Sequence, residues 1–234
     1  MKTVVVTGGS GAIGVEICKQ FKSSGYNVAL FYHSNEKKAC EISREYGIKA
    51  YFVDLRDENS VISALNSVRN DFGKISCLIN CAGICKRGCL QDFSSTDFDN
   101  IFAVNVKGAF LCGKHVLSDM LYYEKGDIIN ISSVWGQRPA SCEVLYSASK
   151  GAIDSFTKSL ADELSGSGIK VNALSLGFVD TPMNKGLSSD DIKEFLSNNG
   201  FDRVILPEEV GKACLKIVNG KASGKIVKLY GIDK

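Results

Sequence analysis

The chain has 234 residues, of which 44% are hydrophobic and 23% charged, and its formal net charge is +2. This composition is that of an ordinary globular protein, and it excludes a disordered chain, which would be poor in hydrophobic residues and rich in charge. The nearly balanced charge also excludes the clustered basic surface of a nucleic-acid-binding protein, so we expect partners to be bound in pockets.

The first apolar run, residues 3–6, is too short for a signal-peptide core or a membrane span, so no membrane association is expected. Nine cysteines, an odd number, indicate reduced thiols and a cytoplasmic location. Cys77, Cys81, Cys85 and Cys89 recur at every fourth residue, but the first of them falls in a predicted strand. They should therefore not share one face, and we expect no metal site.

Seven short apolar runs, each flanked by turn residues, predict buried strands: 3–6, 28–32, 50–53, 77–79, 128–131, 171–176 and 226–229. Longer stretches between them carry apolar residues at helical spacing, such as Ile13, Ile17 and Phe21. This alternation predicts an α/β fold of one domain over residues 1–234, a Rossmann-type doubly wound parallel sheet with helices on both faces. Its ligand site should lie outside the carboxyl ends of the strands, at the topological switch point.

The first strand runs into a glycine-rich turn over residues 7–14, and a helix begins near Ala12. Glycines let backbone amides approach a pyrophosphate, and a helix N-terminus favours an anion. Gly9, Gly11 and Gly14 fit the spacing G-x-G-x-x-G, whereas a longer T-G-x-x-x-G-x-G turn places Ala12 where a glycine is usual. Either register predicts a phosphate-binding turn, and the alternative is a merely tight strand-to-helix connection.

The end of the second strand bears on the choice of coenzyme. NAD sites usually place an acidic residue there to bind the ribose hydroxyls. Here no acid precedes Glu36, and His33, Ser34 and Lys37 stand nearby instead. Because a carboxylate would repel a 2′-phosphate, its absence favours NADP(H) over NAD(H) as the cofactor.

Three residues in the second half of the chain form a candidate catalytic group. Tyr146 and Lys150, four residues apart, share one face of a predicted helix. A neighbouring ammonium favours a phenolate, so Lys150 is expected to lower the pKa of Tyr146. Ser133 ends the fifth strand, where its hydroxyl can orient the same substrate oxygen. Taken singly, each residue also has an ordinary structural explanation.

With the glycine turn, the serine and the Tyr-x-x-x-Lys pair in this order, the chain resembles the single-domain branch of the short-chain dehydrogenase/reductase family along nearly its whole length. The resemblance implies a catalytic tetrad of Asn105, Ser133, Tyr146 and Lys150. In this tetrad Tyr146 donates the proton during carbonyl reduction, and Lys150 also holds the nicotinamide ribose. Asn105 kinks the long helix and anchors a water of the proton relay.

The resemblance also implies further cofactor contacts. Residues 80–83 are similar to the family's N-N-A-G turn, Asp54 matches its adenine contact, and Thr181 its carboxamide contact. The sequence departs from the family pattern at Ala12 and at Leu176, which replaces a proline. The full set of predicted cofactor-binding residues is Gly8, Ser10, Gly11, Ile13, Gly14, His33, Ser34, Asp54, Leu55, Asn80, Ala82, Gly83, Tyr146, Lys150, Gly177, Val179 and Thr181.

Within the family, the nearest likeness is to bacterial 3-oxoacyl-carrier-protein reductases, NADPH-dependent tetramers of fatty acid synthesis. Their basic docking residues are not evident here, because residues 122–125 and 165–168 read YYEK and SGSG. We therefore expect reduction of a small-molecule or acyl-thioester substrate, with acyl carrier protein left open as a partner, by a homotetramer or homodimer. The alternatives are a sugar, polyol or ketone dehydrogenase, and an NADP-sensing protein without turnover.

An amphipathic stretch after Thr181 is expected either to cover a hydrophobic substrate or to pack against the protein's own core. Its apolar residues are Met183, Leu187, Ile192, Phe195 and Leu196.

Overall fold

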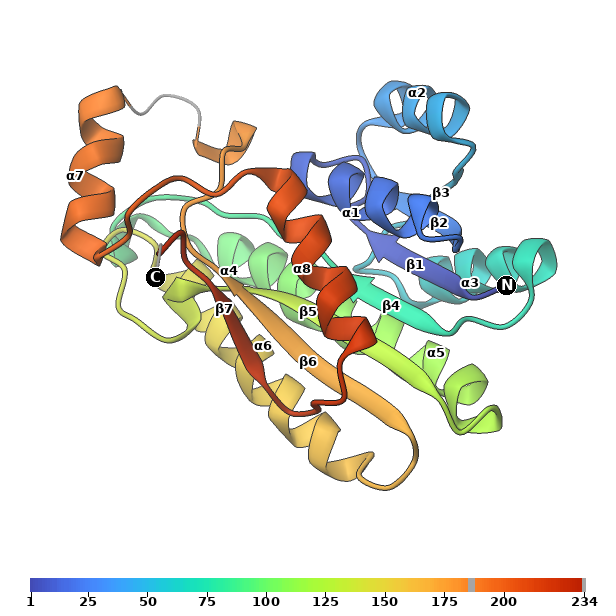
Figure 1. The fold of residues 1–234 in the computed structure, drawn as a ribbon. Helices are drawn as coiled ribbons and strands as arrows, with labels where there is room; N and C mark the ends of the chain where they lie inside the picture. The colour runs from blue at the N-terminus through green and yellow to red at the C-terminus, as the bar shows by residue number, and fades with distance from the viewer. Residues whose placement is uncertain (185–187, 233–234) are drawn as a thin grey trace.

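The computed structural model describes residues 1–184 and 188–232 (Figure 1). All seven predicted strands are present and form one parallel sheet with the order β3-β2-β1-β4-β5-β6-β7. The predicted doubly wound α/β fold is therefore confirmed. The strands are β1 (Thr3–Thr7), β2 (Asn27–Tyr32), β3 (Lys49–Phe52), β4 (Cys77–Asn80), β5 (Gly126–Ser133), β6 (Ile169–Leu176) and β7 (Ile226–Leu229).

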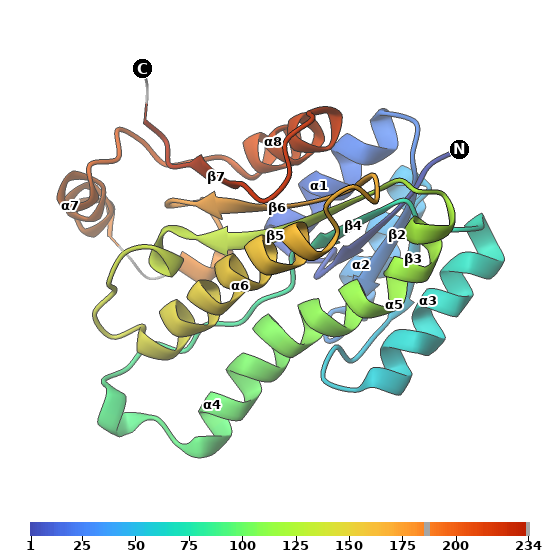
Figure 2. The same ribbon diagram turned by 90° about the horizontal axis from the view of Figure 1, so that it is seen from below.

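Helices cover both faces of the sheet. They are α1 (Ala12–Ser23), α2 (Glu36–Tyr46), α3 (Glu58–Phe72), α4 (Ser95–Phe102), α5 (Gly108–Tyr122), α6 (Val144–Glu163), α7 (Ser189–Asn199) and α8 (Pro207–Asn219). Short helical turns are η1 (Leu90–Asp92), η3 (Val134–Gly136) and η4 (Pro182–Asn184), and η2 (Ala103–Lys107) is a π-helical segment between α4 and α5. Figure 2 shows α1 and α8 on one face of the sheet and α3, α5 and α6 on the other. Within the described ranges, no helix is both long and apolar enough to cross a membrane.

The alternating directions of strand side chains build two hydrophobic cores. Val4 and Val6 of β1 face the core beneath α1, α2 and α8, whereas Val5 faces the core beneath α3, α5 and α6. Both faces of the central strands are thus buried, which explains why these strands are continuous apolar runs.

The chain changes direction at β1. From β1 it passes to β2 and β3 on one side, and it then returns through α3 to place β4 on the other side of β1. The connections that leave the carboxyl ends of β1 and β4 therefore diverge, and the crevice between them is where open α/β sheets bind ligands.

A long excursion leaves the sheet after β6. Val179 and Ile205 pair as an isolated bridge at its base, where the Ile205 amide donates to the Phe178 carbonyl at 2.8 Å and the Asp180 amide to the Ile205 carbonyl at 2.9 Å. The excursion carries α7, whose Phe195 ring packs against Phe178 at a centroid distance of 5.1 Å.

The apolar side of this excursion both packs on the protein and lines the cleft described below, because Phe195 does both. Leu187 lies outside the described residues, as does the side chain of Met183.

Candidate active site

The glycine turn is shaped by contacts that leave no room for side chains. Gly8 has φ +63°, and a Cβ there would lie 2.8 Å from the Ala82 Cα. A Cβ on Gly14 would lie 2.3 Å from the Gly8 carbonyl oxygen, whereas one on Gly9 would meet the Leu30 side chain. Gly8 and Gly14 line the cleft and Gly9 does not, which favours the longer of the two predicted registers.

The turn also carries the features of an anion site. Gly11 is the N-cap of α1, and no side chain caps that end of the helix. The unpaired backbone amides at the start of α1, and with them the positive end of the helix dipole, are therefore at the cleft. The Thr7 hydroxyl accepts hydrogen bonds from the Cys81 and Ala82 amides at 3.0 and 3.1 Å, which fixes the segment after β4 beside the turn.

One cleft of about 680 Å³ runs from this turn along the carboxyl ends of the strands. Most of the predicted site residues line it: Gly8, Ser10, Gly11, Ile13, Gly14, His33, Ser34, Asp54, Leu55, Ala82, Gly83, Ser133, Tyr146, Lys150, Gly177, Val179 and Thr181. Ala12 and Leu176, the two departures from the family pattern, also line the cleft. Asn80 and Asn105 line a separate, smaller cavity.

At one end of the cleft, a charged cluster surrounds Asp54. Arg56 binds both carboxylate oxygens at 2.8 and 2.7 Å, and His33 Nε2 lies 3.7 Å away. The hydrogen bonds from Arg56 lower the pKa of Asp54 to about 2, so its charge is already balanced by the guanidinium. Arg56 and Lys38 also line the cleft, whereas Lys37, the lysine predicted from the sequence, is exposed and does not line it.

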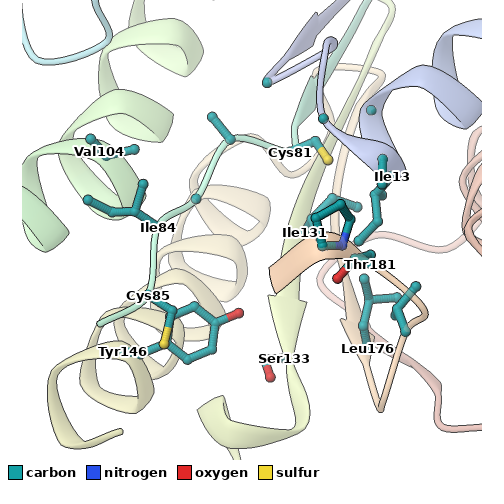
Figure 3. A pocket seen from close by; sticks show the side chains of 18 of the residues that line it. Ile13, Cys81, Ile84, Cys85, Val104, Ile131, Ser133, Tyr146, Leu176 and Thr181 are labelled. Atoms are coloured by element: carbon teal, nitrogen blue, oxygen red, sulfur yellow. The ribbon is translucent and has the colours of Figure 1, made fainter. Parts of the chain in front are cut away.

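At the other end, Ser133, Tyr146 and Lys150 converge. Ser133 is the last residue of β5, and Tyr146 lies in the first turn of α6. The Tyr146 hydroxyl points into the cavity, on the side where Ser133 lies (Figure 3), and a hydrogen bond with Ser133 is among the influences on its pKa. Lys150 Nζ lies 5.6 Å from the centre of the Tyr146 ring and donates to the Ile131 carbonyl at 2.8 Å.

The electrostatics of the tyrosine differ from the expectation. The sequence predicts that Lys150 lowers the pKa of Tyr146, but burial instead raises this pKa above its usual range. The Glu143 carboxylate acts in the same direction, and a hydrogen bond with Ser133 opposes it. Burial also lowers the pKa of Lys150, to about 8. At neutral pH the phenol is therefore protonated and the amine largely charged.

Asn105 occupies the π-helical segment η2, where the predicted long helix is interrupted. Its side-chain oxygen accepts from the Ile84 amide at 2.8 Å, and its amide group donates to the Ile84 carbonyl and the Ser149 hydroxyl, each at 3.0 Å. Ser149 donates in turn to the Tyr146 carbonyl at 2.7 Å. Asn105 thus links the segment after β4 to α6, the helix that carries Tyr146. Ser149 is the connecting residue, and no pattern in the sequence predicts this role.

Asn80 lies beneath the cleft rather than on its wall. Its side-chain amide donates to Asn130 Oδ1 at 2.8 Å, and Asn130 donates to the Thr157 hydroxyl at 2.9 Å. Together with Asn105 and Lys150 it lines the smaller cavity, about 10 Å³, which is close to the room that one water molecule needs.

The end of the cleft near Tyr146 contains charges that the sequence does not predict. Arg87 Nε donates to Glu143 Oε1 at 2.7 Å, and Arg87 Nη2 lies 3.4 Å from Asn184 Oδ1. All three residues line the cleft, as do the aromatic residues Trp135 and Phe195. These residues are 41 to 97 positions apart, so no local pattern brings them together.

A parallel sheet with an uncapped, glycine-lined helix N-terminus at its switch point defines a dinucleotide-binding protein. Residues 2–192 match the family described as short chain dehydrogenase, and the chain belongs to this family of oxidoreductases, which use a nicotinamide cofactor.

Three curated relatives show the range of the likeness. The chain is 32% identical to an uncharacterized oxidoreductase, YmfI, of Bacillus subtilis over 98% of both chains. It is 31% identical to the 3-oxoacyl-(acyl-carrier-protein) reductase FabG of Chlamydia muridarum, over 99% of this chain and 96% of the relative. It is 33% identical to the cyclopentanol dehydrogenase of a Comamonas species, over 95% of this chain and 91% of the relative.

Proposed function

We propose that the chain is an NADP(H)-dependent reductase that converts a carbonyl to a hydroxyl, and that its substrate is a 3-oxoacyl thioester, as in fatty acid synthesis. The observation that carries this proposal is the convergence of Ser133, Tyr146 and Lys150 in the same cleft as the glycine turn. Proton donor, orienting hydroxyl and dinucleotide frame are thereby combined in one site.

The residues present fit a dinucleotide. The uncapped end of α1 and the turn from Gly8 to Gly14 would hold the pyrophosphate. Lys150 would hold the nicotinamide ribose and Thr181 the carboxamide, as the family resemblance implies. When bound, the nicotinamide supplies the hydride for the reduction.

The protein's own residues handle the oxygen and its proton. Ser133 donates a hydrogen bond that orients the substrate carbonyl, and Tyr146 transfers its phenolic proton to the oxygen as negative charge develops there. Lys150 then stabilises the resulting phenolate. Because burial raises the pKa of Tyr146, the phenol holds its proton at neutral pH, which supports reduction over oxidation as the favoured direction.

The proposed preference for NADP(H) is supported by the charges at the adenosine end of the cleft. Among the described residues that follow β2, none that lines the cleft carries a carboxylate. The charge of Asp54, which comes after β3, is balanced by Arg56. Lys38, Arg56, His33 and Ser34 are all available to a 2′-phosphate.

The aromatic wall of Trp135, Phe178 and Phe195 supports an apolar acyl group, and a relative is named for 3-oxoacyl reduction. Whether acyl carrier protein is a partner is left open.

Residues 122–125 are one of the two places where basic docking residues were sought. There, at the end of α5, Tyr122 and Tyr123 are exposed, and the Lys74 ammonium lies 3.1 Å from the centre of the Tyr122 ring.

A second candidate function is suggested by Arg87 and Glu143. This pair presents both a donor and an acceptor to the substrate end of the cleft, which suits a sugar, polyol or small polar ketone. The cyclopentanol dehydrogenase among the relatives supports an alcohol or ketone of this kind.

The test is a panel of acetoacetyl-CoA, cyclic ketones and sugars, each assayed with NADPH and NADH through the change in coenzyme absorbance. We expect turnover of acetoacetyl-CoA with NADPH and loss of turnover in Tyr146→Phe with NADPH binding retained. Tyr123→Phe, on the exposed surface, serves as the control. Binding of NADPH without turnover of any carbonyl would instead identify a sensor.

We also propose that the chain works as a homotetramer or homodimer in the cytoplasm. Phe98 and Phe110 are each 46% exposed on α4 and α5, and Phe98 stacks on Phe102. Such an apolar surface is typical of an interface. Light scattering on the purified protein measures the number of subunits.

A further inference from the structure

Asp154 is a buried carboxylate that the mechanism above does not use. It lies on α6, one helical turn after Lys150, and it is 5% exposed. Among the described residues, neither of its oxygens has a partner that meets hydrogen-bond geometry. Burying an unpartnered carboxylate is costly, so its presence next to the catalytic group requires an explanation.

The residues around Asp154 leave space for its carboxylate, but they do not offset the cost of burying its charge. The turn η3 passes over the carboxylate, and a Cβ on Gly136 would lie 3.0 Å from Asp154 Oδ2. Polar contacts from Ser132 and Gln137 lower its pKa, but burial outweighs them and raises it. The Ser132 hydroxyl is itself buried, and no described residue meets hydrogen-bond geometry with it.

Two cations face Asp154, both from its own helix. Lys158 lies one turn beyond it, with Lys150 one turn before it, and both lower its pKa. Of the two, Lys150 is buried, at 4% exposed, whereas Lys158 is exposed. Residues four apart on a helix are neighbours, and an ion pair is screened least where water is excluded. Lys158 lowers the pKa of Asp154 more than Lys150 does, but Lys150 is the buried cation of the two and the one that lies beside Tyr146.

Few other groups can balance the charge of Lys150. Its described hydrogen bond goes to a neutral backbone carbonyl, that of Ile131. The titratable groups that face it from the segment after β4 are Cys81 and Cys85, and burial raises the pKa of these thiols to about 12 and about 11. Tyr146, above it on α6, is protonated as well. Near pH 8, Asp154 is the anion among these groups.

We infer that Asp154 is the buried counter-charge of Lys150, a positioning residue that keeps the ammonium protonated and in place beneath Tyr146. Its consequence for catalysis rests on the proposed function, whereas the pairing itself does not.

The pairing is tested by nuclear magnetic resonance on protein that carries isotope-labelled lysine, without cofactor. The titrating signal of Lys150 is assigned with Lys150→Met, and its midpoint in the native chain is expected at about 8. Asp154→Asn should lower this midpoint by about one pH unit or more, and Asp154→Glu should retain it. The control is Asp119→Asn, which removes an equally buried carboxylate that binds Arg69 and should leave the Lys150 midpoint unchanged.

The reciprocal measurement covers the case in which Asp154→Asn does not fold. Replacing Lys150 by Met should raise the midpoint of the Asp154 carboxyl, because the coupling between two titrating groups is mutual. An unchanged midpoint, either of Lys150 in folded Asp154→Asn or of Asp154 in Lys150→Met, would overturn the pairing.

The catalytic consequence has its own readout. In Asp154→Asn the alkaline limb of the pH profile of kcat/KM should move to lower pH together with the Lys150 midpoint, whereas a purely structural defect would lower activity equally at every pH. A limb that stays in place while the midpoint moves would show that Asp154 does not act on turnover. Absence of turnover of every carbonyl by the native chain, with the midpoint shift present, would count against the proposed function alone.

Discussion

The side chain of Asn105 and the backbone of Ile84 exchange two hydrogen bonds, one received from the Ile84 amide at 2.8 Å and one donated to its carbonyl at 3.0 Å. The segment after β4, which carries the cleft residues Gly83 and Cys85, is thereby fixed to the π-helical segment. The buried side-chain amide of Asn105 thus bonds both backbone groups of Ile84, as a neighbouring strand would, and fixes the position of one wall of the cleft.

Replacing Asn105 by Ala should therefore affect both stability and binding. The amide and carbonyl of Ile84 lose their side-chain partner, and the Ser149 hydroxyl keeps only its bond to the Tyr146 carbonyl. These losses should lower the free energy of unfolding by about 2–3 kcal/mol in urea titrations. The affinity for NADPH should fall as well. Asn59→Ala, on the exposed side of α3, is the matched control, and equal stability of the two variants would contradict the structural role.

A methyl group at Gly14 should disrupt the glycine turn. It would meet the Gly8 carbonyl oxygen at 2.3 Å and the Gly9 Cα at 2.7 Å, both backbone atoms, so the turn must shift. We expect Gly14→Ala to weaken NADPH binding at least about tenfold in a fluorescence titration. Gly113→Ala in α5, where the nearest side-chain atom would be 3.9 Å away, should stabilise its helix by up to about 1 kcal/mol and leave binding intact. Unimpaired binding by Gly14→Ala would argue against a phosphate site at this turn.

Arg56 should influence the choice of coenzyme. In Arg56→Ala, Asp54 loses the partner that balances its charge, and the cleft loses a cation. Binding of NADPH should fall by about tenfold relative to binding of NADH, because the exposed carboxylate repels a 2′-phosphate and tolerates a ribose hydroxyl. The exposed Arg44 of α2 provides the control substitution. Equal losses for both coenzymes would mean that Arg56 acts only through the fold.

The buried thiols predict a loss of stability in alkali. Burial raises the pKa of Cys18, Cys77, Cys81, Cys112 and Cys214 above the ordinary value of 9.0. Above that pH the unfolded chain releases these protons while the folded chain retains them. The unfolded state then binds fewer protons, and stability falls as pH rises toward the folded-state pKa values, by about 1 kcal/mol for each buried thiol and pH unit.

Melting temperatures measured between pH 8 and about 10 should show this decline. Cys112→Val removes one buried thiol and should make the decline less steep, whereas Cys89→Val, at an exposed position, should leave it unchanged. Parallel curves for all three proteins would exclude thiol ionisation as the cause.

The fold was predictable from the sequence because the central strands are buried on both faces and appear as apolar runs. Strand boundaries differ by one or two residues, as at Val53, which lies beyond β3 but still donates to the Tyr32 carbonyl at 2.8 Å. The proximity of Tyr146 and Lys150 followed from helical spacing alone. Local sequence determines these features, so local patterns predict them.

Other features depend on contacts between distant segments. Arg87 and Glu143 meet although 56 residues separate them. The raised pKa of Tyr146 depends on how deeply the folded chain buries the ring. Lys38 rather than Lys37 lines the cleft, because α2 begins at Glu36 and its rotation decides which lysine turns inward. No pattern in a single sequence contains this information.

The paired residues Val179 and Ile205 close the base of the excursion that bears α7, and none of the described residues between them belongs to a strand of the sheet. The segment can therefore be exchanged or lengthened without altering the register of any strand. A graft between these two positions should alter which compounds the protein accepts while the apparatus for moving the proton stays as it is. Diversity among proteins built on this frame should accordingly accumulate in that stretch.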